Sequence, residues 1–195
     1  MILARVVIGI SGASGAAIGV RIVERLAATE RFEVHLVVSH AGERTLAHEV
    51  GPDSLSRLTQ LVHRRHDIAD IGATIASGSF RTAGMIIAPC SAHSLSAIAY
   101  GAADNLLIRA ADVHLKERRR VVLLLRESPL HLGHIRAMAQ VTEIGAVVAP
   151  VVPAFYLNPA TIADVVDQLA ARAIDLLGVK GCQLAREYNG ETAQP

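Results

Sequence analysis

The segment Gly9-Ile10-Ser11-Gly12-Ala13-Ser14-Gly15 joins two patterns of different period. The apolar run Val6–Ile10 leads into it, and after it Ile18, Ile22 and Leu26 recur at every fourth position. This order predicts a strand, a glycine-rich turn and a helix. Glycines and small hydroxyl residues let the backbone turn sharply, and the first amides of the helix favour an anion such as a phosphate. A tight turn that binds no ligand is the alternative, and the segment lacks the Gly-Lys-Ser/Thr ending of a P-loop.

Strand and helix patterns alternate along the rest of the chain. Apolar runs predict six strands, at Val6–Ile10, Glu33–Ser39, Leu61–His63, Gly84–Ala88, Val121–Leu125 and Ala146–Ala149. The predicted helices include Ala41–Glu49, Ala92–Tyr100, Asn105–Arg118, one with Pro129 just inside its start that ends near Ile144, and Thr161–Leu177. This alternation is typical of an α/β fold with a doubly wound, Rossmann-like (flavodoxin-like) parallel sheet and helices on both faces. We expect one domain over residues 1–179 and a polar C-terminal tail over residues 180–195, either a loose end or an arm onto a neighbouring subunit.

Composition excludes several classes of protein. A net charge of +1 over 195 residues argues against a dedicated nucleic-acid binder. No apolar run reaches the roughly 18 residues of a membrane span, and no leader pattern precedes the first strand, so we expect a cytoplasmic protein. The two cysteines, Cys90 and Cys182, lack the spacing of a zinc site, and the histidine pairs lack a third ligand, so we expect no metal.

Polar side chains follow the predicted strands at their carboxyl ends, where doubly wound sheets bind ligands. They come from Ser11 and Ser14, Ser39-His40, Cys90-Ser91-Ala92-His93-Ser94, Arg126-Glu127 and Phe155-Tyr156. Such a set suits a phosphorylated, partly aromatic ligand. The second strand ends on Ser39 and not on the Asp or Glu that binds the ribose of NAD, which favours a mononucleotide such as FMN. Ser91 is also a natural helix cap.

The chain resembles the flavin prenyltransferases of the UbiX type over about residues 5 to 178. The resemblance is carried by residues 9–16, Ala76-Ser77-Gly78-Ser79-Phe80, Pro89-Cys90-Ser91, residues 109–119, Arg126-Glu127-Ser128-Pro129-Leu130-His131 and Pro153-Ala154-Phe155-Tyr156. The block Arg109–Arg119 (RAADVHLKERR) and the block Arg126–His131 (RESPLH) are its most specific parts.

The resemblance implies an enzyme that transfers the dimethylallyl group of dimethylallyl phosphate to N5 and C6 of reduced FMN, without a metal. The product, prenylated FMN, would serve a partner UbiD-type decarboxylase. Family members form large homo-oligomers, typically dodecamers, with flavin sites at subunit contacts. Two alternatives remain: an FMN-dependent decarboxylase of the cysteine type, and a non-catalytic FMN-binding subunit of a decarboxylase.

The resemblance also assigns roles to individual residues. The FMN contacts would be Gly12, Ala13, Ser14, Ser39, Ser91, Ala92, His93, Ser94 and Arg126. The contacts to dimethylallyl phosphate would be Arg109, Lys116, Tyr156 and Arg172, and the catalytic groups would be Ser14, Glu49, Lys116 and Glu127. From the residues alone, Arg109 and Lys116 could equally be a solvent-exposed pair on one helix face. The chain departs from the family at Ala92 and His93, where a larger apolar residue and a lysine are frequent, and Tyr188 stands in a tail that carries tryptophan in some members.

Overall fold

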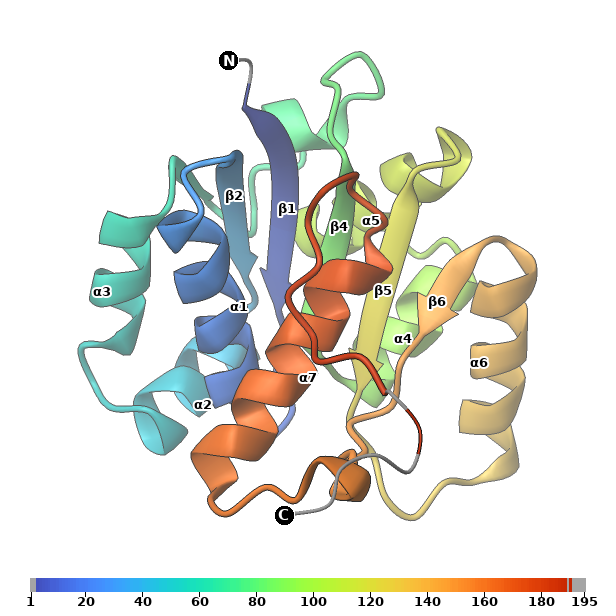
Figure 1. Ribbon diagram of the computed structural model, residues 1–195. Coiled ribbons are helices and arrows are strands. Elements are labelled where there is room, and N and C mark those ends of the chain that lie inside the picture. The colour runs from blue at the N-terminus through green and yellow to red at the C-terminus, as the bar shows by residue number, and fades with distance from the viewer. Residues whose placement is uncertain (1–2, 189, 191–195) are drawn as a thin grey trace.

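A computed structural model describes residues 3–188 and 190 and shows a sheet of six parallel strands between two layers of helices (Figure 1). The strands are β1 (Ala4–Ile10), β2 (Phe32–Val38), β3 (Arg64–His66), β4 (Gly84–Cys90), β5 (Arg120–Leu125) and β6 (Ala146–Val148). Their order across the sheet is β3-β2-β1-β4-β5-β6, and every pairing is parallel. The chain winds outward in one direction from β1 and in the other from β4. The predicted fold class is confirmed, and the crevice between β1 and β4 is where such sheets bind ligands.

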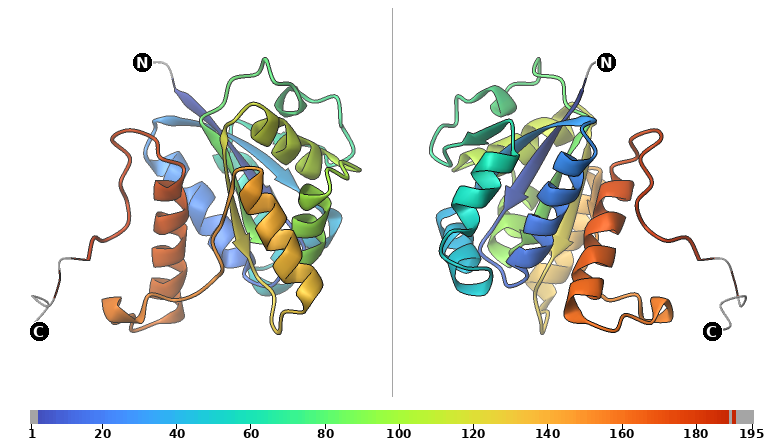
Figure 2. Two further views of the ribbon diagram at one scale, coloured as in Figure 1. Left: turned by 90° about the vertical axis from the view of Figure 1, so that its right-hand side faces the viewer. Right: turned by 60° about the vertical axis from the view of Figure 1, so that its left-hand side comes forward.

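Helices cover both faces of the sheet because neighbouring strand residues face opposite sides (Figure 2). The helices are α1 (Ala16–Ala28), α2 (His40–Glu49), α3 (Ser54–Leu61), α4 (Ala92–Ala99), α5 (Leu106–Lys116), α6 (Leu132–Glu143) and α7 (Ile162–Leu176), with 3-10 turns η1 (Thr74–Ala76) and η2 (Phe155–Leu157). On β1, Ile8 packs into the core with α1 and α7, and Val7 packs into the core with α4, α5 and α6. None of the described helices is long and apolar enough to cross a membrane.

Two predicted elements are displaced in the structure. The weak strand expected at Leu61–His63 is wrong in place: α3 continues to Leu61, and the strand is β3, Arg64–His66. Arg64 and Arg65 are exposed on this edge strand, so it has no apolar alternation to reveal it. The helix expected to begin near Pro129 begins at Leu132, because His131 acts as its N-cap and accepts a 3.0 Å hydrogen bond from the Gly133 amide.

Gly19 lies where α1 approaches β4 most closely. A Cβ at this position would overlap the carbonyl oxygen of Ala88 and lie 3.2 Å from the side chain of Ile10. Gly19→Ala is therefore expected to push α1 off the sheet and to lower the free energy of unfolding by about 1–3 kcal/mol. Urea unfolding at fixed protein concentration measures this change. Gly72→Ala is the matched control, because its Cβ would meet only the Asp70 carboxylate at 3.6 Å, and equal stability of the two variants would contradict the prediction.

The described part of the C-terminal tail packs against its own chain. The Arg31 guanidinium donates to the carbonyl oxygens of Lys180, at 3.1 Å, and Gly181. The Asp175 carboxylate accepts from the amides of Leu184 and Ala185 at 2.7 and 2.9 Å. Hydrogen bonds thus hold residues 180–185 against Arg31 and Asp175 of the same chain, whereas residues 189 and 191–195 of the predicted tail lie outside the described residues.

Candidate functional site

The loops that follow β1 and β4 are joined by one buried hydroxyl. Ser11 is 1% exposed, and its Oγ donates to the Pro89 carbonyl at 2.9 Å and accepts from the Ser91 amide at 2.8 Å. Both hydrogen-bonding sides of the hydroxyl are therefore used within the protein. Sequence reasoning placed Ser11 among the polar groups available to a ligand, and the structure shows instead that it fixes the two walls of the crevice relative to each other.

The start of α1 already holds an anion. Oε2 of Glu49, the last residue of α2, accepts hydrogen bonds of 2.9 Å from the amides of Gly15 and Ala16. Burial works to raise the pKa of Glu49, but hydrogen bonds from the Ser14 hydroxyl and these two amides outweigh burial, and the pKa lies below its usual value. The sequence suggested a ligand phosphate at these amides. In the structure, the chain's own Glu49 carboxylate occupies the amides of Gly15 and Ala16, whereas the contacts expected at Gly12, Ala13 and Ser14 stay a prediction.

Glu49→Gln is expected to lower the free energy of unfolding by about 1–2 kcal/mol near neutral pH, because hydrogen bonds to a charged acceptor are stronger than those to an amide. Because the pKa of Glu49 is lower in the folded state, its ionisation stabilises the fold fully at pH values above the unfolded pKa. The difference in unfolding free energy between variant and wild type should therefore vanish as the pH falls through the folded pKa of Glu49. Urea unfolding at several pH values measures both effects. Glu24→Gln is the control, since Glu24 forms an exposed pair with Arg21, and an equal loss there would refute a special role for Glu49.

Two more helices begin at the same edge of the sheet, each capped by a predicted site residue. The Ser39 hydroxyl accepts from the Gly42 amide at 3.0 Å at the start of α2, and the Ser91 hydroxyl accepts from the Ser94 amide at 3.1 Å at the start of α4. The predicted capping role of Ser91 is confirmed. Each serine satisfies one amide, so the remaining amides and the helix dipoles leave partial positive charge at this edge.

The other residues predicted to contact FMN surround these caps. Gly12 lies in the turn before α1, where a Cβ would overlap Ala41 at the start of α2. Arg126 follows β5, and its charge is close enough to Glu49 to help lower the pKa of that carboxyl. His93 is exposed on the first turn of α4. The donor set at this edge, amides plus one guanidinium, suits a flavin that carries a phosphate.

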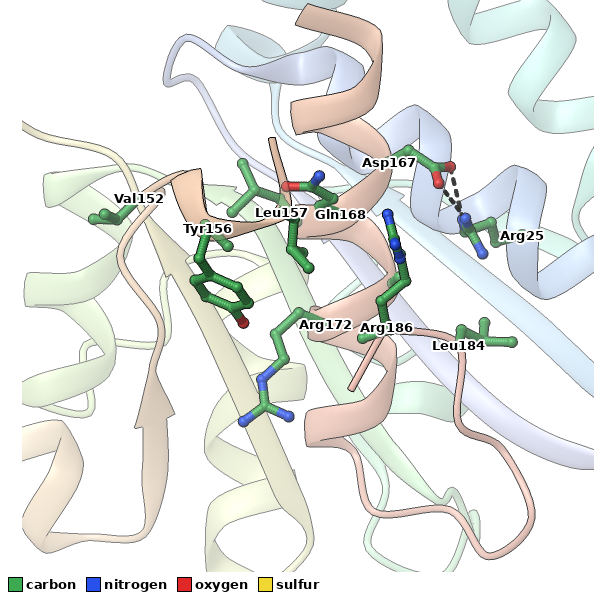
Figure 3. A pocket seen from close by; sticks show the side chains of 13 residues that line it. Arg25, Val152, Tyr156, Leu157, Asp167, Gln168, Arg172, Leu184 and Arg186 are labelled. Atoms are coloured by element: carbon green, nitrogen blue, oxygen red, sulfur yellow. Dashed lines mark hydrogen bonds and ion pairs between the residues drawn. The ribbon is translucent and has the colours of Figure 1, made fainter. Parts of the chain in front are cut away.

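Tyr156 and Arg172, both predicted to bind the substrate phosphate, line one pocket of about 290 Å³ (Figure 3). Tyr156 comes from η2 and Arg172 from α7, and the tail closes the pocket through Leu184, Ala185 and Arg186. The Tyr156 ring also meets the Tyr188 ring edge-on, with 5.3 Å between the ring centroids. Sequence reasoning missed Arg186 because a polar tail offers no periodicity that predicts packing.

This pocket is electropositive. Its one acidic lining residue, Asp167, bonds Arg25 and Arg21, and the hydrogen bond from Arg25 is the main cause that holds the pKa of Asp167 below its usual value. Among the described residues, Arg172 and Arg186 form no ion pair. Two guanidinium groups are thus available to a phosphate.

Lys116 and Tyr156 lie at opposite ends of the strands of the sheet. Lys116 ends α5, which leads into the amino end of β5, whereas Tyr156 follows the carboxyl end of β6. The Lys116 ammonium pairs with Glu117, and Arg109 of the same helix pairs with Asp112 at 2.7 Å. Glu127, at the carboxyl end of β5, accepts from the Ser128 amide at 3.0 Å. A single chain therefore brings Tyr156 to Arg172 and does not bring Lys116 to either. Within the described part of the chain, no group of three His, Cys, Asp or Glu residues is arranged to hold a metal ion.

Comparisons with known proteins agree with this geometry. Residues 3–174 match the Flavoprotein family. The chain is 56% identical over 173 residues to the flavin prenyltransferase UbiX of Thauera aromatica, covering 88% of this chain and 87% of the relative. The crystal structure of AnUbiX (PadA1) in complex with FMN and dimethylallyl pyrophosphate superposes with a TM-score of 0.91 at 41% identity, over 97% of this chain and 99% of that one. A dodecameric FMN-dependent UbiX-like decarboxylase from Escherichia coli O157:H7 gives a TM-score of 0.90, also at 41% identity, over 95% and 100% of the two chains.

Proposed function

The chain belongs to the UbiX family of flavin prenyltransferases, and we propose that it joins the dimethylallyl group of dimethylallyl phosphate to N5 and C6 of reduced FMN. The observation that carries this function is the pocket in which Tyr156 offers a phenol to a phosphate and Arg172 a guanidinium that forms no ion pair among the described residues. The chain is 41% identical to one solved with FMN and dimethylallyl pyrophosphate. A binding subunit that only stored flavin would not need this second phosphate pocket.

The crevice at the carboxyl ends of β1 and β4 would hold the flavin. The residues proposed to contact it are Gly12, Ala13, Ser14, Ser39, Ser91, Ala92, His93, Ser94 and Arg126. Bound FMN supplies the nitrogen and carbon atoms that accept the prenyl group. The protein's own part is to bind, orient and exclude water. Ser14, which donates to Glu49, connects the crevice to a carboxylate that is held ionised.

Tyr156 and Arg172 would bind the phosphate of the prenyl donor and stabilise its negative charge as the carbon–oxygen bond breaks. Glu49 and Glu127 are proposed to hold and move protons beside the flavin and the phosphate. Lys116 and Arg109 are proposed to act on the same phosphate from a neighbouring copy. Within one chain, Lys116 lies at the amino ends of the strands, whereas Tyr156 lies at their carboxyl ends. This arrangement fits a homo-oligomer, and a dodecamer is the assembly of one similar structure.

The product, prenylated FMN, is proposed to pass to a UbiD-type decarboxylase, and the reaction is proposed to take place in the cytoplasm. Both proposals rest on family membership. Prenyl transfer itself would need neither that partner nor a metal.

The function is tested by incubating the purified protein anaerobically with reduced FMN and dimethylallyl phosphate, and in parallel with the pyrophosphate. Mass spectrometry should detect FMN enlarged by one dimethylallyl group with no decarboxylase present. FMN that stays bound and unmodified with both donors would refute the proposal and favour the non-catalytic subunit. Oxidative decarboxylation of a peptide with a C-terminal cysteine would instead favour the cysteine-type decarboxylase.

Subunit mixing tests whether the site is shared. Lys116→Ala and Arg172→Ala homo-oligomers should each be nearly inactive. After dissociation and reassembly together, mixed oligomers should regain part of the activity, since some sites then combine an intact Lys116 with an intact Arg172. No recovery, with mixed assembly confirmed by native mass spectrometry, would place both residues in one chain's site.

A further inference from the structure

A short segment packs on the end of α5 that carries Lys116. Residues 77–82, here the 77–82 segment, connect η1 to β4 at the amino edge of the sheet. A Cβ on Gly78 would overlap the Glu117 carboxylate and lie 2.9 Å from the Lys116 ammonium nitrogen. With the Lys116–Glu117 pair placed as it is, the backbone at residue 78 has no room for a Cβ. The 77–82 segment therefore limits where the Lys116 side chain can lie.

Arg119 and Arg5 hold the middle of the 77–82 segment. The Arg119 guanidinium donates to the carbonyl oxygens of Gly78 and, at 2.8 Å, Phe80. The Phe80 ring lies 4.6 Å from the Arg5 guanidinium carbon and meets the His35 ring edge-on, with 5.1 Å between centroids. These contacts fix Gly78 and Phe80, and the Ala83 amide donates to the Arg5 carbonyl at 2.7 Å, but none of them involves the Thr82 side chain at the end of the segment.

His114 holds that end. It lies on α5 two residues before Lys116 and is 1% exposed. One ring nitrogen, Nδ1, lies 2.7 Å from the Ala110 carbonyl oxygen, and the other, Nε2, lies 2.7 Å from the Thr82 hydroxyl. Because a carbonyl only accepts, Nδ1 carries the proton, and in the neutral ring Nε2 accepts from the Thr82 hydroxyl.

A buried imidazole is costly unless both nitrogens are satisfied. A leucine at residue 114, on a helix whose other buried side chains are nearly all apolar, would avoid this cost. The histidine gains a link to Thr82 that a leucine cannot make. This hydrogen bond links α5, two residues before its end at Lys116, to Thr82, two residues before β4. Thr82 is the last residue of the 77–82 segment, which contacts Lys116 at Gly78.

We propose that His114 is a positioning residue, which by holding Thr82 fixes the 77–82 segment against the Lys116 end of α5 and so sets the direction in which Lys116 meets the phosphate of the prenyl donor. The inference rests on the proposed function, in which Lys116 reaches a neighbouring copy's pocket. Lysine has a long, flexible stem and a compact charge, so its placement depends on what packs around it. Without the packed 77–82 segment, the Lys116 ammonium would sample many positions and bind the phosphate less tightly.

The test replaces His114 by leucine, Thr82 by valine, and both together. Each single change should raise KM for dimethylallyl phosphate by about tenfold or more, because small misplacements of a binding group are costly, while Kd for FMN changes by less than about twofold. The double variant should be no worse than the worse single variant, since both remove the same link. His114→Gln, whose side-chain oxygen can still accept from Thr82, should restore most of the wild-type KM.

A stability control separates positioning from general damage. Val141→Ala removes buried methyl groups from α6 in the same core layer, away from the 77–82 segment. Two results would show that His114 has no positioning role. One is that Val141→Ala, with the same loss of unfolding free energy as His114→Leu, raises KM for dimethylallyl phosphate equally. The other is that His114→Leu leaves this KM unchanged. The mixing experiment with Lys116→Ala and Arg172→Ala tests the shared site separately. If mixing restores activity but His114→Leu does not change KM, this inference is overturned and the shared site remains supported.

Discussion

Lys116→Ala is expected to lower kcat/KM for dimethylallyl phosphate by about a hundredfold to a thousandfold, the usual cost of removing one preorganised group that stabilises charge in a transition state. The Lys116 side chain is 48% exposed in the single chain and contacts its own chain through Glu117 and the close approach of Gly78. Little of the fold depends on its ammonium. FMN binding and the urea midpoint should therefore stay near wild type.

Steady-state kinetics with reduced FMN, and flavin fluorescence titration for Kd, measure the two quantities separately. Lys180→Ala is the matched control, because Lys180 is the chain's other lysine and its hydrogen bond to Arg31 comes from the backbone carbonyl, which the substitution keeps. Lys180→Ala should retain wild-type turnover. Full turnover of Lys116→Ala would remove Lys116 from the phosphate site, and loss of FMN binding in Lys116→Ala would assign it to the flavin instead.

The protein is expected to lose roughly 3 kcal/mol of unfolding free energy between pH 6.5 and pH 5, because two buried histidines cannot take up protons in the folded state. Burial, aided by the charge of Arg119, lowers the pKa of His114 to about 4. Burial, aided by His35 and Arg64, lowers the pKa of His66 to about 4. His35, which hydrogen-bonds His66 at 2.9 Å, has a lowered pKa for the same main reason.

The sign follows from the unfolded chain, in which a histidine titrates near pH 6.5. Below that pH the unfolded state binds protons that the folded state does not bind. The contribution of these histidines to the free energy of unfolding is therefore largest above about pH 6.5 and decreases as the pH falls to about 4. Urea unfolding at fixed protein concentration, repeated every half pH unit, gives the number of protons from the slope. His114→Gln should reduce the slope by about one proton. A flat profile from pH 6.5 to 5 in the wild type would contradict the prediction.

Much of the fold could be predicted because a parallel sheet covered on both faces needs continuous apolar strands. Val121–Leu125 and Val6–Ile10 appear in the structure within a few residues of their predicted limits. The edge strand β3 was misplaced because Arg64 and Arg65 face solvent and carry no periodic signal. The start of α6 was misplaced because a histidine serves as its N-cap, in place of the more usual Ser, Thr, Asp or Asn.

Less of the candidate site could be predicted, because its decisive features join residues far apart in sequence. The turn at Gly9–Gly15 signals an anion, but only the folded chain shows that the Glu49 carboxylate accepts from the amides of Gly15 and Ala16. Family resemblance named Lys116 and Tyr156 together, and only the topology shows them at opposite edges of one sheet. The link between His114 and Thr82 crosses 32 residues of sequence and leaves no local pattern.

The hydrogen-bonded C-terminal segment means that the pocket lined by Tyr156 and Arg172 is finished only after the sheet during translation. Every strand and helix described above is complete once Leu176 has been synthesised, whereas the pocket wall formed by Leu184 to Arg186 is made afterwards. A premature stop, or an exopeptidase that removed this segment, would therefore spare the sheet and the flavin crevice. Such a product would still be expected to bind flavin, but the pocket lined by Tyr156 and Arg172, proposed to take the prenyl donor, would lack one side.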